Sequence, residues 1–354
     1  MNLQQYVDKN RPQLVKHIQN FFREKRLLLD SSLCFDQDTL IKLEPFTLNG
    51  KLLRGVLLLL AYEMHGGKLN NNVFNAAAAI ELTHSGFLIH DDIMDRDRLR
   101  RGLPTIYEQY RLMGEKLKTK DSLNFGQSLA ICAGDLMFFM AMELLTKTIT
   151  NNLQLKKIQE TFNSIVYGVL SGQMLDVYYG SAGLEPTHQT VMDIYRYKTA
   201  FYSFSLPFKI GASLSNQTDK NIKVLEKLGE YLGLIFQIKD DEMGIYGDEK
   251  IIGKPIGSDI RENKKTLLRA LLYEKSSQVE KEKLNQLFGK PTVSKEDVNF
   301  IIMQLDNKNI RQKINNILKT LVQKTERLIK KLSCEEKYKQ LLRELIEYNL
   351  KRNK

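Results

Sequence analysis

The segment that decides the fold class is residues 73–95, VFNAAAAIELTHSGFLIHDDIMD. Alanine and leucine favour helix, and apolar residues recur at spacings of three and four, so one long helix is predicted over residues 73–94. The same spacing recurs in three further stretches, residues 127–148, 153–178 and 224–243. Neither an alternating strand pattern nor an internal repeat is present in the sequence. We therefore expect an all-α fold, as a single domain over residues 1–354, with several helices longer than the usual ~11–12 residues.

The charge of the chain limits the classes of partner. The 354 residues carry a formal net charge of +11, from 53 Lys and Arg against 42 Asp and Glu. Such an excess is compatible with nucleic acid, anionic lipid or an anionic small substrate. Many basic residues of the last third have the spacing of a solvated helix face, and no basic patch with interleaved aromatic residues is present. We expect no nucleic-acid partner and at most peripheral contact with membranes.

The cysteines and the N-terminus bear on the cellular compartment. Cys34, Cys132 and Cys334 are odd in number and far apart, without metal-ligand spacing, which favours a reducing compartment. Residues 1–10 are polar and lack the apolar segment of a signal peptide. The longest apolar run, residues 56–62, is too short to span a bilayer. We therefore expect a cytoplasmic protein.

The long helix ends in three aspartates, Asp91, Asp92 and Asp95. Asp91 and Asp95 are four residues apart and share a helix face, so the carboxylates repel one another unless a cation lies between them. Oxygen ligands suit Mg²⁺, which typically binds one or two protein carboxylates together with substrate phosphates. A solvated acidic helix end is the alternative, but residues 86–89 are apolar, which favours a functional site. Residues 96–102, RDRLRRG, follow, and their arginines either pair with the aspartates or grip phosphates.

A second apolar helix ends in residues 236–241, FQIKDD, with the carboxylates Asp240 and Asp241. Gln237 shares a helix face with Asp241, four residues later. Cationic groups stand at several other places in the sequence, namely Lys51 with Arg54, Lys198 beside Thr199, Lys254, and Lys264 beside Lys265. Each group alone is a weak signal. Together, two carboxylate sites and these cations predict a cavity for a metal-bound diphosphate and for a second diphosphate.

These residues, in this order, resemble the trans-isoprenyl diphosphate synthases, the family of farnesyl and geranylgeranyl diphosphate synthases, and especially its archaeal-type short-chain members. The motifs that carry the resemblance are Gly50-Lys51-x-x-Arg54, His84 before Asp91-Asp92-x-x-Asp95, Arg100-Arg101-Gly102, Gly172-Gln173 with Asp176, Lys198-Thr199, Phe236-Gln237-x-x-Asp240-Asp241, and Gly253-Lys254 before Asn263-Lys264. They span residues 50–264, and residues 341–351 resemble the family's last helix. The resemblance implies an all-α fold around a deep central cavity, a polyprenyl synthetase domain over residues 1–354, and a homodimer.

The resemblance also implies a cofactor, two substrates and their contacts. The cofactor is Mg²⁺, about three ions per active site. The substrates are isopentenyl diphosphate and an allylic diphosphate (dimethylallyl, geranyl or farnesyl). The metal ligands would be Asp91, Asp92 and Asp95 for two ions and Asp240 and Asp241 for the third, and these aspartates with Lys198 would be the catalytic residues. The allylic diphosphate would contact Arg100, Lys198, Thr199, Gln237, Lys254 and Lys264. Isopentenyl diphosphate would contact Lys51, Arg54, His84 and Arg101.

Three positions need separate interpretation. His84 lies seven residues, about two helical turns, before Asp91 on the same face. A lone histidine on an apolar helix is usually a core residue, but this one points toward the metal end, which favours a diphosphate contact. His90 has no such role in the family and is interpreted as structural. The second aspartate motif has Gly244 in place of its last aspartate, so that position is set aside as a ligand.

The implied reaction is a head-to-tail condensation. The allylic diphosphate ionises, the double bond of isopentenyl diphosphate attacks the allylic cation, and a proton is then lost. Product length in the family depends on side-chain bulk just before Asp91. Gly86 offers no barrier, Phe87 is either the floor of the cavity or ordinary core, and Thr83 lies one turn deeper. This pattern favours geranylgeranyl diphosphate as product, with geranylfarnesyl and farnesyl diphosphate as alternatives.

Three other functions are alternatives. A class I terpene cyclase would share the first aspartate motif but would not need the second set of cations, Lys51, Arg54 and Arg101. A non-catalytic subunit of a prenyl synthase would have damaged aspartates, whereas all five are present. A metal phosphohydrolase, suggested by His90 beside Asp91, would need further histidine ligands, and the 5 histidines of the chain have no metal-ligand spacing.

Overall fold

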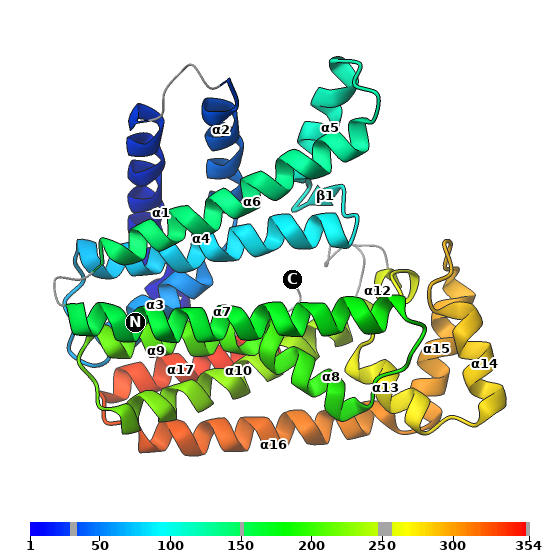
Figure 1. Cartoon of the computed structure of the whole chain (residues 1–354). Coiled ribbons are helices and arrows are strands. Elements are labelled where there is room, and N and C mark those ends of the chain that lie inside the picture. The colour runs from blue at the N-terminus through cyan, green and yellow to red at the C-terminus, as the bar shows by residue number, and fades with distance from the viewer. Residues whose placement is uncertain (29–33, 149–151, 247–256, 352–354) are drawn as a thin grey trace. The chain divides into compact units, whose positions relative to one another are not determined.

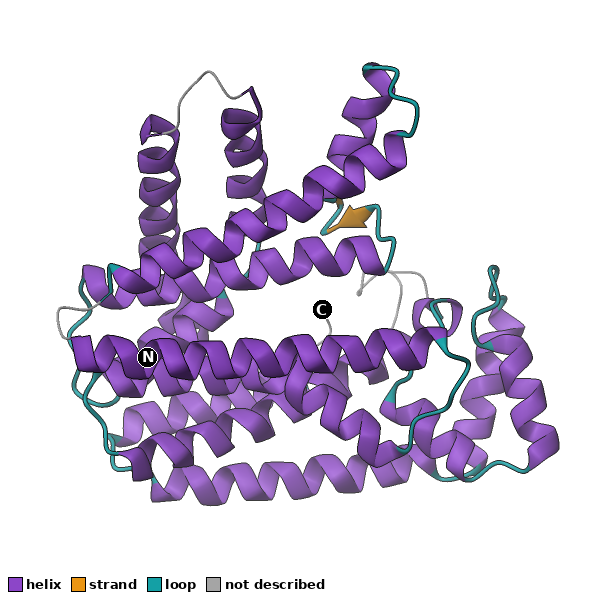
Figure 2. Cartoon of the chain, viewed as in Figure 1, coloured by secondary structure: helices purple, strands orange, loops and turns teal. Residues whose placement is uncertain are grey.

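The computed structural model describes residues 1–28, 34–148, 152–246 and 257–351 (Figure 1). Over these residues the structure is helical except for loops and one antiparallel ribbon, in which β1 (Leu99–Arg100) pairs with β2 (Leu103–Pro104) (Figure 2). The prediction of an all-α fold is confirmed. The chain divides into two compact units, the first of Met1, Leu3–Glu160 and Ile210–Gln217 and the second of Asn2, Thr161–Lys209 and Thr218–Lys354. The single domain over residues 1–354 stays a prediction.

The first unit is built on α4 (Asn71–Met94), the helix predicted over residues 73–94. Its other helices are α1 (Leu3–Leu28), α2 (Cys34–Leu48), α3 (Leu53–Glu63), α5 (Ile106–Lys116) and α6 (Ser122–Thr146), with the start of α7 (Asn152–Ser181) and the end of α9 (Leu206–Leu214). The Asn70 side chain caps α4 by accepting a hydrogen bond from the backbone N–H of Val73 at 3.2 Å. The small residues Ala76–Ala79 are fully buried, so α3 and α6 pack closely on α4 (Figure 1).

Helix α6 is long and apolar enough, by length and composition, to cross a membrane, and it is the only such helix in the described ranges. Its most apolar 18-residue stretch has a mean hydropathy of 1.7, and 44% of that stretch is buried. Uninterrupted apolar runs do not reveal this helix, because Gly126, Ser128 and Gly134 stand among its apolar residues. Within the first unit α6 packs against α4 and α5, as a core helix of a globular protein does.

The second unit is built on α10 (Asp219–Tyr246), against which η1 (Tyr195–Ser205), α16 (Ile310–Lys331) and α17 (Glu336–Leu350) pack (Figure 1). Its other helices are α8 (His188–Ile194), α12 (Ser258–Arg261), α13 (Leu267–Glu274), α14 (Gln278–Leu287) and α15 (Lys295–Asn307), with most of α7. Leu225, Leu228, Leu232 and Ile235 of α10 are fully buried, so this helix supplies the centre of the core.

The element η1 is a π-helix of 11 residues. π-helices are rare, occur mostly as single turns, and are frequent at functional sites. This one carries Lys198 and Thr199, both of which the sequence predicts to contact a diphosphate. The helical periodicity of the sequence gave no sign of the wider hydrogen-bonding pattern.

Candidate functional site

The carboxyl end of α4 carries the first aspartate cluster. Asp91 and Asp92 lie in its last turn, and Asp95 is the C-cap residue, whose backbone N–H donates to Asp91 O at 2.8 Å. Asp92 is fully buried, and its Oδ1 accepts a hydrogen bond from Arg100 Nε at 2.6 Å. Arg100 Nη2 lies 2.6 Å from the same oxygen and 4.0 Å from Asp91 Oδ2. One arginine therefore balances part of the negative charge of the cluster.

The second carboxylate oxygen of Asp92, Oδ2, is buried and has no hydrogen-bond partner among the described residues. Burial is the main cause that raises the pKa of Asp92 to about 7, and the bond to Arg100 offsets only part of that rise. A divalent cation that prefers oxygen ligands, such as Mg²⁺, would balance the negative charge of this oxygen and serve as its partner. The residues at this helix end therefore fit a metal ion. In the part of the chain that the structure describes, however, no group of three or more His, Cys, Asp or Glu side chains already forms a ligand set.

The β1–β2 hairpin places two predicted phosphate contacts beside this cluster. Its two turn residues, Arg101 and Gly102, both have positive φ, at 52° and 76°, as a two-residue type I′ turn requires. The hairpin directs Arg100 to Asp92 and brings Arg101 to Gly50. A Cβ on Gly50 would lie 3.1 Å from Arg101 Nη1, so the glycine makes room for the guanidinium. The segment that begins Gly50-Lys51 is thus adjacent to the hairpin.

Four of the predicted diphosphate contacts form a cationic group in the first unit, namely Arg54, His84, Arg100 and Arg101. Burial, followed by the charges of Arg54, Arg101 and Arg100, lowers the pKa of His84 well below its ordinary value. His84 is therefore neutral at pH 7 and can donate a hydrogen bond without adding charge. Arg100 is already paired with Asp92, but Arg54 and Arg101 also place positive charge around the neutral imidazole, which suits an anionic ligand. Lys51 is exposed, just before α3.

Glu81 is a residue of this group that the sequence analysis missed. It is 2% exposed, and its Oε1 accepts a hydrogen bond from the backbone N–H of Gly55 at 2.6 Å. It therefore caps the start of α3, where the preceding Leu52 has a left-handed φ of 52° and no side-chain cap. Burial raises the pKa of Glu81, and Arg54 and Arg101 oppose that rise. The signal in the sequence was a lone acidic residue within an apolar helix, three positions before His84.

The predicted product-length residues lie where α4 meets α6. Gly86 is buried, and a Cβ there would lie 2.9 Å from Phe138 Cε1 and 3.1 Å from Gly134 O. The space in front of Gly86 is therefore filled by α6, and Phe138 is a further candidate for setting product length. Phe87 contacts Phe138 edge-on, with ring centroids 5.1 Å apart. Thr83 is buried and donates to Ala79 O at 2.8 Å.

His90 contacts an aromatic ring and a carboxylate of α6. Its ring stacks on Phe138 at 5.7 Å and 10°, and its Nε2 lies 3.2 Å from Asp135 Oδ1. These neighbours are all on α6 and include no second histidine. They are compatible with the structural interpretation of His90.

The second aspartate pair lies near the carboxyl end of α10 and its members differ. Asp240 is exposed, whereas Asp241 is 6% exposed. Asp241 Oδ1 accepts a hydrogen bond from Gln237 Nε2 at 2.9 Å, and its Oδ2 accepts one from the hydroxyl of Tyr195. Burial is the main cause that raises the pKa of Asp241 well above its ordinary value, with the charge of Asp259 next. The buried member of the pair is thus held by side chains on both η1 and α10.

Lys198 and Thr199 project from η1 toward two neighbouring helices. Lys198 Nζ lies 2.5 Å from Asp176 Oδ2 on α7, and Thr199 Oγ1 donates to Gln237 Oε1 at 3.0 Å. A Cβ on Gly172 would lie 2.8 Å from the backbone N of Lys198, so the glycine allows α7 and η1 to approach. The predicted motif residues of this half therefore come together, with Lys198 in an ion pair.

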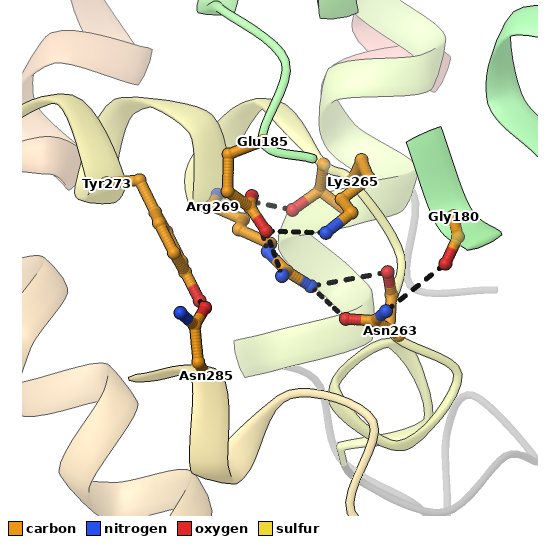
Figure 3. A network of polar contacts seen from close by, with 8 residues as sticks. Gly180, Glu185, Asn263, Lys265, Arg269, Tyr273 and Asn285 are labelled. Carbon is orange, nitrogen blue, oxygen red and sulfur yellow. Dashed lines mark hydrogen bonds and ion pairs between the residues drawn. The ribbon is translucent and has the colours of Figure 1, made fainter. Parts of the chain in front are cut away.

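Lys264 lies on the loop between α12 and α13. The neighbouring loop residues Asn263 and Lys265 belong to a network of polar contacts around Arg269 and Glu185 (Figure 3). Arg269, 3% exposed, donates from Nη1 to Asn263 Oδ1 at 2.6 Å and to Asn263 O at 3.2 Å. Glu185 accepts from Arg269 Nε at 3.0 Å and from Lys265 Nζ at 2.5 Å. Lys264 itself points elsewhere, with Nζ 3.0 Å from Glu262 Oε2. Glu185 and Arg269 were missed, since only the folded chain brings them together.

The structure therefore places the predicted residues in two groups. The group in the first unit contains Arg54, His84, Asp91, Asp92, Arg100 and Arg101. The group in the second unit contains Asp176, Lys198, Thr199, Gln237, Asp241 and Lys264. Lys254 lies outside the described residues. A deep cavity that unites both groups stays a prediction of the resemblance.

The comparisons with known proteins agree on one family. Residues 42–305 match the family model described as polyprenyl synthetase. The chain is 35% identical over 255 residues to a geranylgeranyl diphosphate synthase of Sulfolobus acidocaldarius, covering 72% of each protein. It is 30% identical over 253 residues to a geranylfarnesyl diphosphate synthase of Aeropyrum pernix, covering 70% of this chain and 73% of that protein.

A solved structure matches nearly the whole chain. It is a geranylgeranyl pyrophosphate synthase of Corynebacterium glutamicum in complex with isoprenyl diphosphate and magnesium. The TM-score is 0.90 with 27% sequence identity, and the match covers 98% of this chain and 99% of that one.

Proposed function

Because the chain belongs to the polyprenyl synthetase family, we propose that it is a short-chain prenyl diphosphate synthase that joins isopentenyl diphosphate head-to-tail to allylic diphosphates. The observation that carries the proposal is a metal site with a separate set of cations beside it, in one unit. Asp92 Oδ2, which is buried and has no hydrogen-bond partner among the described residues, suits the metal of a metal-bound diphosphate, and Arg100 lies against this aspartate. Arg54 and Arg101 lie around the neutral His84 and suit a second diphosphate. A class I terpene cyclase, which binds one diphosphate, would not need that second group.

Mg²⁺ is the proposed cofactor, held by Asp91, Asp92 and Asp95 at one place and by Asp240 and Asp241 at the other. When bound, it would supply positive charge that stabilises the departing diphosphate. Arg100 assists from the protein side, since its guanidinium already lies against Asp92 and can turn its remaining N–H groups to a phosphate. The presence of three ions, implied by the resemblance, belongs to this proposal.

Isopentenyl diphosphate is proposed to bind at Lys51, Arg54, His84 and Arg101. The hairpin turn fixes Arg101 against Gly50, and the Glu81 carboxylate fixes the first turn of α3, which carries Arg54. Neutral His84 would donate a hydrogen bond to a phosphate oxygen. These residues bind and orient the nucleophilic double bond of isopentenyl diphosphate for attack.

The allylic diphosphate is proposed to contact Arg100, Lys198, Thr199, Gln237, Lys254 and Lys264. In the second unit the Thr199 hydroxyl and the Gln237 amide are already ordered by hydrogen bonds, so they meet a phosphate with little loss of side-chain freedom. Lys198 would exchange its ion pair with Asp176 for the substrate. The proton lost at the end is proposed to leave with the diphosphate, which needs no side-chain base.

Geranylgeranyl diphosphate is the proposed product, and geranylfarnesyl diphosphate is the first alternative. Of the three proteins compared above, two are named for geranylgeranyl diphosphate and one for geranylfarnesyl diphosphate. Farnesyl diphosphate is the shorter alternative. Phe87 and Phe138 are the proposed barriers to the growing chain, because they fill the space beside Gly86.

A homodimer is proposed as the assembly. Ile131, Asp135 and Phe139 recur every four residues on one face of α6, and Ile131 and Phe139 are 44% and 75% exposed. Exposed apolar side chains on one helix face are typical of a surface that a partner covers. Light scattering should give twice the mass of the chain. The cytoplasmic location and at most peripheral membrane contact remain predictions.

One incubation tests the proposal. The pure protein with Mg²⁺, isopentenyl diphosphate and, in separate reactions, dimethylallyl, geranyl and farnesyl diphosphate should form longer prenyl diphosphates, read by chromatography after dephosphorylation. Conversion of an allylic diphosphate without any dependence on isopentenyl diphosphate would favour a terpene cyclase. No conversion of any primer would favour a non-catalytic subunit.

A further inference from the structure

Tyr195 is the first residue of η1 and belongs to none of the motifs that mark the site. Its side chain is 7% exposed and packs among buried apolar residues, among them Ile238 and Leu267. Its hydroxyl, however, makes two polar contacts. It donates to Asp241 Oδ2 on α10 and accepts the backbone N–H of Leu267, the first residue of α13, at 2.7 Å.

These contacts complete the hydrogen bonding of a buried carboxylate. Asp241 Oδ1 is bound by Gln237 and Oδ2 by Tyr195, from two different elements. A buried carboxylate that loses such a partner is left poorly solvated, so both bonds constrain where the side chain points. The ring of Tyr195 could serve packing alone, but a packing role needs no hydroxyl.

The bonds continue beyond Asp241 to the residues proposed to meet the allylic diphosphate. Gln237 donates to Asp241 through Nε2 and accepts from Thr199 through Oε1, at 2.9 and 3.0 Å. The orientation of the Gln237 amide is therefore set by Asp241, which accepts only its NH₂ group. Tyr195 and Thr199 are four residues apart on η1, and both reach α10.

The same hydroxyl also reaches the loop that carries Lys264. Leu267 follows that loop directly, and the positive charge of Lys264 lowers the pKa of Asp241, against the larger effect of burial. Tyr195 thus ties η1, α10 and the start of α13 together at one oxygen atom.

We propose that Tyr195 is a positioning residue whose hydroxyl holds Asp241, and through it Gln237 and Thr199, in the arrangement that receives the allylic diphosphate. The inference rests on the proposed function. It assigns Tyr195 no contact with substrate or metal.

The test is Tyr195→Phe, which removes the hydroxyl and keeps the ring. The matched control is Tyr246→Phe on the same helix as Asp241, because the Tyr246 hydroxyl is buried with no hydrogen-bond partner among the residues described. Calorimetry with Mg²⁺ and a non-reactive thiolo analogue of geranyl diphosphate measures binding without turnover. Steady-state kinetics then separates the KM of the allylic substrate from that of isopentenyl diphosphate.

We expect Tyr195→Phe to weaken analogue binding, and to raise the allylic KM, on the order of 10-fold, the loss of one hydrogen bond to a charged group. The KM of isopentenyl diphosphate and the analogue affinity of Tyr246→Phe should stay at the wild-type value. Equal analogue affinities in both variants would overturn the inference, as would an equal rise in both KM values.

A double-mutant cycle keeps the inference testable if Tyr195→Phe lowers the thermal stability. Asp241→Asn changes the group through which Tyr195 acts, so adding Tyr195→Phe to it should cause little further loss of analogue affinity. Additive losses would overturn the inference. If the wild-type chain binds the analogue but never consumes isopentenyl diphosphate, the proposed function fails while the comparison of the variants still decides the role of Tyr195. Failure of the wild-type chain to bind the analogue would overturn both.

Discussion

Asp259 of α12 lies directly against Gly244 of α10, so that a methyl group on Gly244 would collide with the Asp259 carboxylate. Gly244 is the position at which the second aspartate motif lacks its last carboxylate. A residue further along the chain thus places a carboxylate at the same point in space. Asp259 also raises the pKa of Asp241, after the larger effect of burial, and its Oδ1 lies 3.7 Å from Lys264 Nζ.

An aspartate introduced at position 244 should therefore lower both the stability and the activity of the protein. In Gly244→Asp, two carboxylates would compete for one space, and like charges at such a distance repel strongly. We expect a lower melting temperature and at least ~10-fold weaker Mg²⁺-dependent activity, a loss of about 1.4 kcal/mol in the transition state. Thermal unfolding and a Mg²⁺ titration measure the two effects. The paired variant Gly244→Asp/Asp259→Gly should recover part of both, and a harmless Gly244→Asp would show that Asp259 does not fill this place.

His84 should make the stability of the chain depend on pH. Burial and the neighbouring arginines lower the pKa of His84 from its ordinary 6.5 in the folded chain. The unfolded chain therefore binds the proton more readily. The free energy of unfolding has its full value above about pH 6.5 and decreases as the pH falls below that value. The slope from one such group is at most about 1.4 kcal/mol per pH unit. We expect the free energy of unfolding, measured with urea between pH 5 and 7.5, to change less with pH in His84→Gln than in the wild type. An identical pH dependence in both proteins would contradict a lowered pKa of His84.

Glu81 should matter for stability and for isopentenyl diphosphate together. Glu81→Ala leaves the buried N–H of Gly55 without its acceptor, which costs about 1–3 kcal/mol. Because the first turn of α3 also carries Arg54, the KM of isopentenyl diphosphate should rise. Glu81→Gln keeps an acceptor oxygen and is the matched control, with a smaller effect in urea unfolding. A loss of stability with an unchanged KM would separate the cap from the substrate site.

The buried charges around Arg269 should decide whether the Lys264 loop is ordered. The Arg269 Cζ atom lies 4.1 Å from the centroid of the Phe288 ring. Arg269→Met keeps an apolar contact with this ring but removes the bonds to Glu185 and Asn263 (Figure 3). We expect a loss of about 1–3 kcal/mol in the free energy of unfolding and a higher KM for the allylic diphosphate. The control is Lys275→Met, because the exposed Lys275 ammonium donates to the backbone oxygen of Lys308 and takes no part in the network around Arg269. Faster amide hydrogen exchange confined to residues 262–266 would support this role, and unchanged exchange would contradict it.

The sequence was informative wherever local pattern determines structure. The stretches predicted over residues 127–148, 153–178 and 224–243 correspond to α6, α7 and α10, with ends that differ by a few residues. These helices are long and carry apolar residues at helical spacing, which is a local property. The family was also identified from short motifs, and the prediction of a prenyl diphosphate synthase is confirmed by the comparisons.

What the sequence did not reveal depends on distant partners. Glu81, Tyr195 and Asp259 act on Gly55, Asp241 and Gly244, which are far from them or unremarkable in the sequence. The π-helical form of η1 was also missed, because π-helices are rare and occur mostly as single turns within α-helices, so an α-helix is the default expectation for a helical pattern. The arginines after Asp95 were left between two roles, and the structure shows one of them, Arg100, paired with Asp92.

Product length gives the sharpest test of the α4–α6 contact. Phe87 and Phe138 meet edge-on beside Gly86, so each is a candidate for the floor of the cavity. Removing the side chain that stops the growing chain should lengthen the product, because each added isoprene unit then finds apolar space. We expect longer products from Phe138→Ala, and from Phe87→Ala if its ring is also part of the floor. Phe74→Ala, at the other end of α4, is the control and should leave the product unchanged.

Adding bulk at Gly86 distinguishes the role of the Phe138 ring from that of the Phe87 ring. A larger residue at Gly86 would meet Phe138 at once, since even a Cβ would lie 2.9 Å from its ring. Gly86→Ala should therefore push Phe138 away from α4 and change the chain length of the product, while the residue at position 87 stays phenylalanine. A combined Gly86→Ala/Phe138→Ala variant should relieve the crowding, raise the melting temperature above that of Gly86→Ala, and give the long product of Phe138→Ala. If products stay the same in every variant with Phe138 replaced, while Phe87→Ala alone lengthens them, Phe87 is the floor and Phe138 only supports it.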